Sequence, residues 1–330
     1  IKDRTNRLAV ATNNLFLTLF VKIKVAFAYV VPKCFIIASL FKTQMYNVMP
    51  PLVDKKRSFC MIKLVVTDID DTLVNSRNEI SKKNREVIEK CKEQDIKVIL
   101  ASGRPDFGMM KIVEDLKLDS YDNYLLSYNG ARIANLKTGE VVYEKFLSPE
   151  RIKFLIDIAL ENDCDILTYQ NGDVLTNRDN EYARVEVGLV GAKLIIAENM
   201  KEHIKEGAAK VIILKHPDEA QAVKEKLQKE LGDEYEVATS KPFFIEVNDK
   251  GISKGNSLDA LCKKLGLTKD NVMALGDGLN DLSMIEFAGM GVAVDNANLV
   301  LKEAADFISK SNDEDGFAYA IEKFILNNEN

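Results

Sequence analysis

The chain has 330 residues, of which 46% are hydrophobic and 29% are charged, and this composition is typical of a globular protein. Its formal net charge of −6 argues against a nucleic-acid-binding protein, which normally has a basic face, and favours a small soluble substrate. Five scattered cysteines without a CxxC pair fit a reducing cytoplasm. Only two histidines occur, His203 and His216, and neither lies in a metal-ligand spacing such as HExxH. Together with the absence of CxxC this argues against a zinc site or a histidine-based triad, so we expect chemistry based on carboxylates, lysine and hydroxyl groups.

The first sixty residues contain apolar clusters that Lys22, Lys24 and Lys33 interrupt. They therefore lack a run of about 18 apolar residues, which a membrane-spanning helix needs. We interpret residues 1–60 as a non-native or disordered extension and Met61, which directly precedes the first convincing strand, as the native start. A membrane anchor is the alternative. The fold is predicted from the rest of the chain.

Beyond this extension, apolar strand patterns alternate with helical patterns. In chain order, the predicted elements are strand 62–69, helix 81–95, strand 97–103, helix 107–116, strand 123–130 and a hairpin-like pair over 131–146. Alternation of this kind is the signature of a parallel sheet with helices on its faces.

The pattern changes at Ser148, which with Pro149 and Glu150 opens a helix. The predicted elements that follow are strands 165–170 and 173–177, an unassigned stretch over 178–200, strand 209–216, helix 217–232 and strands 235–240 and 243–248. This block predicts an α+β unit with its own, mostly antiparallel sheet.

Alternation of helices and strands then resumes. The remaining predicted elements are helix 254–265, strand 271–278, helix 279–289, strand 290–296, helix 299–304, strand 306–309 and a last helix from residue 316. We therefore predict an α/β fold with a Rossmann-like, doubly wound parallel core over residues 61–146 and 249–330. An α+β cap domain over residues 147–248 is inserted into this core.

Polar residues lie at the ends of three predicted strands. Asp68 and Asp70 lie at the end of the first strand, Ser102 and Gly103 at the end of the second, and Asp277 at the end of a later one. Because ligands bind outside the carboxyl ends of the parallel strands in a doubly wound sheet, we expect these residues to form one shared site.

This site has the composition of a phosphoryl-transfer site. Asp68 and Asp277 can share a hard divalent cation, and Mg²⁺ prefers oxygen ligands of this kind. The cation would offset the repulsion among the crowded carboxylates. Lys254 opens a helix just after the inserted unit and adds positive charge for an anion, to which Ser102 and the Gly103 amide can donate hydrogen bonds.

Four motifs resemble those of the haloacid dehalogenase (HAD) superfamily of phosphatases. "DIDDT" at 68–72 looks like its first motif, Ser102 its second, Lys254 its third and "GDGLND" at 276–281 its fourth. Ser102 stands where threonine is frequent and keeps the hydroxyl group.

Further motifs narrow the resemblance to the Cof-like hydrolases with a type IIB cap, which are similar to sugar phosphatases. They are "SYNGA" at 127–131, "GISKGNSL" at 251–258 and the insertion between the second and third motifs. The resemblance extends from Met61 to about residue 325.

The resemblance implies a role for each matching residue. Asp68 would attack phosphorus and form an aspartyl-phosphate, and Asp70 would act as general acid and then general base. Neighbouring carboxylates are expected to favour the protonated form of Asp70. Lys254 would be the third catalytic residue. The implied Mg²⁺ ligands are Asp68, Asp277, the Asp70 carbonyl group and, in the first or second shell, Asp281. The implied substrate-binding residues are Ser102, Gly103, Asn129, Gly130, Lys254 and Asn280.

One further residue near the second motif remains open to two interpretations. Arg104 either contacts the substrate or forms an ion pair with a neighbouring acid.

The predicted function is that of a cytoplasmic, Mg²⁺-dependent phosphatase that acts on small phosphorylated metabolites and binds neither nucleic acid nor a membrane. In this family such substrates are sugar phosphates or cofactor phosphates such as flavin mononucleotide and pyridoxal phosphate. A phosphomutase, a non-catalytic binding or regulatory module, and a membrane-anchored phosphatase are the alternatives.

Overall fold

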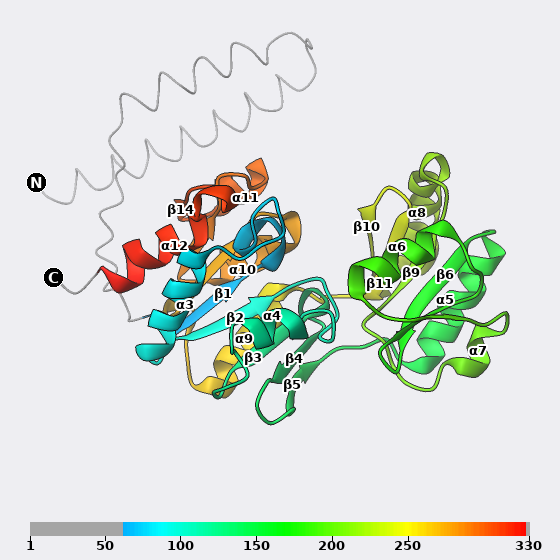
Figure 1. Cartoon of the computed structure of the whole chain (residues 1–330). Coiled ribbons are helices and arrows are strands. Elements are labelled where there is room, and N and C mark those ends of the chain that lie inside the picture. Colours follow the sequence, from blue (N-terminus) through cyan, green and yellow to red (C-terminus); the bar gives the residue numbers. More distant parts are fainter. Residues whose placement is uncertain (1–61, 328–330) are drawn as a thin grey trace, which may run out of the picture. The chain divides into compact units, whose positions relative to one another are not determined.

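Two β-sheets organise the chain in the computed structural model, which describes residues 62–327 (Figure 1). The predictions for residues 1–60 lie outside the described residues. Of the helices within 62–327, none combines the length and the apolar character that crossing a membrane requires.

The first sheet has eight strands in the order β14-β13-β12-β1-β2-β3-β4-β5. The pairs from β14 to β3 are parallel, whereas β4 and β5 are added in antiparallel fashion. The strands are β1 (Leu64–Thr67), β2 (Lys97–Ala101), β3 (Tyr124–Ser127), β4 (Arg132–Asn135), β5 (Val141–Glu144), β12 (Val272–Gly276), β13 (Met290–Ala293) and β14 (Phe307–Ile308).

Helices cover both faces of this sheet, as alternate side chains of β1 show. Val65 belongs to a hydrophobic cluster with residues of α3 and α12, while Leu64 and Val66 belong to another cluster with residues of α9 and α10. Burial on both faces explains why β1 and β12 are continuous apolar runs. The helices of this part are α3 (Lys82–Glu93), α4 (Met110–Asp115), α9 (Lys254–Leu265), α10 (Leu282–Phe287), α11 (Leu299–Ala304) and α12 (Gly316–Ile321).

The second sheet has six strands in the order β10-β11-β9-β6-β7-β8, and α5 and α8 contribute to a hydrophobic cluster with its strands. All its pairs are antiparallel except β7 with β8, which is parallel. The strands are β6 (Asp165–Gln170), β7 (Asp173–Thr176), β8 (Leu194–Ile196), β9 (Lys210–Leu214), β10 (Tyr235–Lys241) and β11 (Phe244–Asp249). The helices are α5 (Pro149–Glu161), α6 (Glu181–Val190), α7 (Met200–His203) and α8 (Pro217–Leu231).

The predicted α/β fold with a Rossmann-like parallel sheet is confirmed, with local differences. The helix expected from residue 107 begins at Met110, because the amides of Gly108 and Met109 bond to the Pro105 and Asp106 carbonyl groups in turns. The helix expected over 279–289 is a 3₁₀ turn, Leu279–Asp281, followed by α10.

Candidate active site

The ends of three neighbouring strands bring the predicted site residues together. β1 lies between β12 and β2, so Asp68 directly follows the central strand, and its amide donates to the Leu275 carbonyl oxygen of β12 at 3.0 Å. Ser102 follows β2 and is almost fully buried, and its amide bonds to β3. The parallel register therefore places motifs that are far apart in the sequence at one edge.

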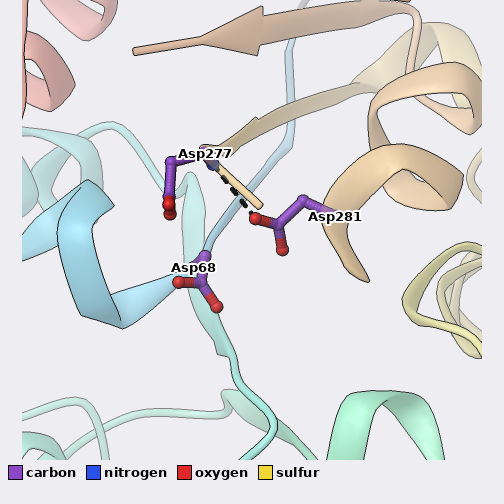
Figure 2. Close-up of side chains that lie close together, drawn as sticks. All are labelled: Asp68, Asp277 and Asp281. Carbon is purple, nitrogen blue, oxygen red and sulfur yellow. Dashed lines mark hydrogen bonds between the residues drawn. The ribbon is translucent and has the colours of Figure 1, made fainter. Parts of the chain in front are cut away.

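Three carboxylates lie close together at this edge, as Figure 2 shows for Asp68, Asp277 and Asp281. One oxygen of each lies within 4.8 Å of the others. Burial and the neighbouring carboxylates raise the pKa of Asp68 to about 7, although Lys254 acts in the opposite direction. Burial and the charge of Asp281 likewise raise the pKa of Asp277 to about 6. Negative charge is thus under-compensated here, and a cation would stabilise the cluster.

The buried ammonium group of Lys254 links the cluster to β2. It donates to Asp68 Oδ1 at 2.5 Å, to Asp281 Oδ1 at 2.6 Å and to the Ala101 carbonyl oxygen at 2.8 Å. Burial alone would lower the pKa of Lys254, but Asp281 and Asp68 outweigh it and raise that pKa. Lys254 is therefore a fixed positive charge with all three of its protons bonded.

Local sequence explains the position of Lys254. Ser253 caps α9 by accepting a hydrogen bond from the Asn256 amide, so Lys254 is the first residue of the helix. A Cβ at Gly255 would lie 2.2 Å from the Ser283 carbonyl oxygen, so only glycine lets the first turn of α9 pack against α10.

Both oxygens of Asp281 are already engaged. Oδ1 accepts from Lys254, and Oδ2 accepts from the amides of Asp277 and Gly278 at 3.0 and 2.9 Å. Asp281 therefore orients the loop that carries Asp277, in addition to its place in the three-carboxylate cluster.

Thr72 also holds Asp277 and was not among the predicted site residues. Its hydroxyl group donates to Asp277 Oδ1 at 2.8 Å, and the residue is fully buried. The signal was present in the sequence, because Thr72 is the final residue of the first motif.

The Asp70 side chain lies outside the three-carboxylate cluster, and Arg104 binds both of its oxygens. The expected effect of the neighbouring acids on Asp70 stays a prediction. Of the two interpretations of Arg104, the structure shows the ion pair.

A left-handed turn, Tyr128–Gly130, joins the second motif to the start of α9. The backbone amide of Asn129 donates to the Ser102 carbonyl oxygen at 2.9 Å. The side-chain oxygen of Asn129 accepts a hydrogen bond from the Asn280 side chain at 3.1 Å. Gly130 has a φ of 96°, and a Cβ there would lie 2.4 Å from the Ser253 carbonyl oxygen. This glycine therefore permits close packing of the turn against α9.

All predicted site residues come from the part of the chain that surrounds the eight-stranded sheet. The contacts connect Asp68, Lys254 and Asp281 directly, and Asn129 connects Ser102 with Asn280. Their roles in catalysis, metal binding and substrate binding stay predictions.

The family assignment rests on a match that covers most of this chain. Residues 65–321 match the family described as haloacid dehalogenase-like hydrolase. The chain belongs to this family.

The names of two similar proteins agree with this family membership. YcsE of Bacillus subtilis, named as 5-amino-6-(5-phospho-D-ribitylamino)uracil phosphatase, is 34% identical over 267 residues, which are 80% of this chain and 96% of YcsE. The crystal structure of a haloacid dehalogenase-like hydrolase from Bacteroides thetaiotaomicron has 39% identity and a TM-score of 0.76, covering 80% of this chain and 100% of that one. The predicted superfamily and the predicted class of enzyme, a phosphatase-type hydrolase, are thereby confirmed.

The structure of the HAD subclass IIB sugar phosphatase BT4131 also superposes on this fold. It has a TM-score of 0.65 and 24% identity, and covers 79% of this chain and 98% of that one. At this identity the similarity concerns the fold alone.

Proposed function

We propose that the protein is a Mg²⁺-dependent phosphatase that hydrolyses small phosphate monoesters through a phosphoryl group carried on Asp68. The observation that carries the proposal is the position of Asp68: it follows the central strand, between a buried lysine and two further carboxylates.

Asp68 meets the requirements of a carboxylate nucleophile. Lys254 binds Oδ1, which fixes the side chain and compensates part of its charge. Within residues 62–327, no hydrogen-bond donor contacts Oδ2, so that oxygen is free to attack phosphorus. The bond formed is Asp68 O–P, and the bond broken joins phosphorus to the leaving oxygen.

The donor set fits Mg²⁺, which prefers carboxylate and carbonyl oxygens and keeps several waters. Asp68, Asp277 and the Asp70 carbonyl group would hold the ion. Burial, together with neighbouring carboxylates, raises the pKa values of Asp68 and Asp277, and a bound cation would offset both effects. When bound, Mg²⁺ would polarise the phosphoryl group and neutralise its developing charge. Asp281 would act mainly by orienting Asp277 and Lys254, since its oxygens are already engaged.

The remaining predicted residues would handle the phosphoryl and leaving groups. Asp70 would give a proton to the leaving oxygen and later accept one from the water that attacks the aspartyl-phosphate. Ser102 and the Gly103 amide would donate to phosphoryl oxygens, together with Lys254. Asn129, which is fixed by its hydrogen bonds, would border the leaving group.

We assign the core to residues 61–146 and 249–330 and the cap to residues 147–248. The second sheet and its own hydrophobic cluster support this division, because both are built from the inserted segment. A cap of this kind would exclude surplus water and supply contacts to the leaving group.

The substrate class is proposed as sugar phosphates and cofactor phosphates such as flavin mononucleotide or pyridoxal phosphate. The name of YcsE adds a phosphorylated ribitylaminouracil to the compounds that should be tested on this chain. These compounds are all small phosphate monoesters, which is the feature that the Asp68 site would recognise.

Phosphate release from such a panel tests the proposal, with wild type, Asp68→Asn and the surface control Asp119→Asn, each with Mg²⁺ and with EDTA. We expect Mg²⁺-dependent release by wild type and the control, and none by Asp68→Asn. Isomerised product without free phosphate would instead identify a phosphomutase. Release that persists in Asp68→Asn would contradict the proposed nucleophile.

A further inference from the structure

Asp70, the proposed general acid, is closed off by a neighbouring arginine. Arg104 Nη2 lies 2.5 Å from Asp70 Oδ1, and Arg104 Nε lies 3.0 Å from Asp70 Oδ2. The guanidinium group thus binds both carboxylate oxygens in a fork, the strongest geometry for such a pair.

The backbone of Arg104 is held independently of this fork. Its amide donates to the Ser102 hydroxyl oxygen at 3.2 Å, and its carbonyl oxygen accepts from the Tyr128 amide at 3.0 Å. The guanidinium group can therefore change partners by side-chain rotation alone, while the second motif stays in place.

The fork is incompatible with the proposed work of Asp70. To protonate the leaving oxygen, one Asp70 oxygen must come within about 2.6–3.2 Å of it and carry the proton between them. A guanidinium group has donors only, so it cannot pass on a proton, and it occupies one lone pair on each Asp70 oxygen. We therefore expect Arg104 to release at least one Asp70 oxygen before the substrate reacts.

An anionic oxygen of the substrate is the partner that can draw Arg104 away. The side chains of Asp70 and Arg104 are 50% and 27% exposed, so a substrate can reach the ion pair from solvent. The planar guanidinium group matches phosphate as well as carboxylate. Arg104 also follows Ser102 and Gly103, the residues proposed to bind the phosphoryl group.

We propose that Arg104 is a displaceable clamp, which holds Asp70 in the free enzyme and transfers to an anionic oxygen of the substrate on binding. This inference rests on the proposed function. Arg104 would then have two effects: it contributes to phosphoryl binding, and it keeps Asp70 from acting until a substrate is present.

Kinetics of Arg104→Met and Arg104→Lys test the clamp, with p-nitrophenyl phosphate as substrate and orthovanadate as competitive inhibitor. Loss of one charged hydrogen-bonding partner is expected to raise KM and the vanadate inhibition constant together by about 10- to 100-fold in Arg104→Met. Arg104→Lys, which keeps the charge, should recover part of both. If Arg104 merely holds Asp70 in place, KM and the vanadate inhibition constant stay at their wild-type values. Only kcat on alkyl phosphates then falls, as it would in Asp70→Asn.

A structure of the full chain with Mg²⁺ and orthovanadate gives the direct answer. We expect Arg104 to bind vanadate oxygens and to have left Asp70. A fork still closed on both Asp70 oxygens beside bound vanadate would overturn the clamp. A complex with a phosphate monoester that has an anionic leaving group would show whether Arg104 binds the anion of the leaving group in place of the oxygens that vanadate occupies. An inactive wild type would count against the proposed function, whereas an active wild type with vanadate inhibition unchanged in Arg104→Met would refute only the clamp.

Discussion

Asp68→Asn should stabilise the metal-free fold at neutral pH while it abolishes activity. Burial and two neighbouring carboxylates raise the pKa of Asp68 from 3.8 to about 7. The folded state therefore binds this proton more tightly than the unfolded state does, and the stability that results is lost as the pH rises from about 4 through about 7. Asparagine has no charge to desolvate and keeps an oxygen that can accept from Lys254.

The size of the effect follows from the shift in the pKa of Asp68. A shift of about three units at about 1.4 kcal/mol per unit means that ionisation of Asp68 lowers the free energy of unfolding by about 4 kcal/mol at pH 8. At pH 5 the loss is only about 1.7 kcal/mol, because this pH lies little more than one unit above the pKa of the carboxyl group in the unfolded state. These values are upper bounds, since water entry and relaxation of the site reduce them.

Urea denaturation in EDTA at pH 5 and pH 8 measures this difference in the free energy of unfolding. Asp119→Asn, an exposed position with the same change of charge, is the matched control. We expect Asp68→Asn to gain more stability at pH 8 than at pH 5, and saturating Mg²⁺ to reduce the gain. An Asp68→Asn protein that is no more stable than wild type at pH 8 would refute the reasoning.

Three other predictions concern the same edge of the sheet. Thr72→Val removes the hydrogen bond to Asp277, so the Mg²⁺ dissociation constant, measured by calorimetry, should rise about 10-fold, whereas Thr72→Ser should keep most of the affinity. Mg²⁺ affinity of wild type should increase with pH through the raised pKa values of Asp277 and Asp68, about 6 and about 7, because the ion displaces their protons; titrations in buffers of different ionisation enthalpy count those protons. Gly130→Ala should lower the free energy of unfolding in urea by about 1–3 kcal/mol, because its Cβ would meet the Ser253 carbonyl oxygen.

Each of these predictions has a clear contrary result. Equal Mg²⁺ affinity in Thr72→Val and wild type would show that the hydroxyl group does not orient Asp277. Binding of Mg²⁺ without proton release between pH 6 and 7 would show that the metal does not bind the clustered carboxylates. An unchanged unfolding curve for Gly130→Ala would mean that the turn can move away from α9 without cost.

The position of the site could be predicted from the sequence because strand ends determine it. β1 and β12 are buried along their whole length, so their apolar runs were readable, and the next residues had to emerge at the ligand-binding edge. Lys254 was predicted to open a helix, and Ser253 caps α9 directly before it in the structure. The strand pattern thus sufficed to place Asp68 and Asp277, whereas the place of Asp281 was implied by the family resemblance alone.

The partner of Asp70 could not be predicted in the same way. Arg104 lies 34 residues further along the chain, and the direction of its side chain depends on the path of the loop after β2. Sequence spacing gives the order of strand ends along an edge, but it does not say which long side chain turns toward which acid. The structure therefore adds a partner of Asp70 that its neighbours in the sequence did not identify.

The stretch over 178–200 resisted assignment because its apolar and charged residues are not separated between two faces of a helix. Helix α6 buries Glu186, which accepts a hydrogen bond from the Tyr169 hydroxyl group, together with Ala183 and Val190, while Val185 and Leu189 are exposed. Valines and Gly188 also weaken the intrinsic preference for a helix. Tertiary contacts determine this helix, and a helical period of apolar residues could not show it.

Trapping the phosphoryl group during turnover tests the central claim most directly. Wild-type protein would be mixed with substrate and Mg²⁺, quenched in acid within milliseconds and reduced with borohydride, which converts an aspartyl-phosphate to homoserine, and the modified residue would be located by mass spectrometry. The account predicts homoserine at position 68 and none in Asp68→Asn. Rapid turnover with no modified Asp68 at any quench time, or with the modification at another residue, would contradict it.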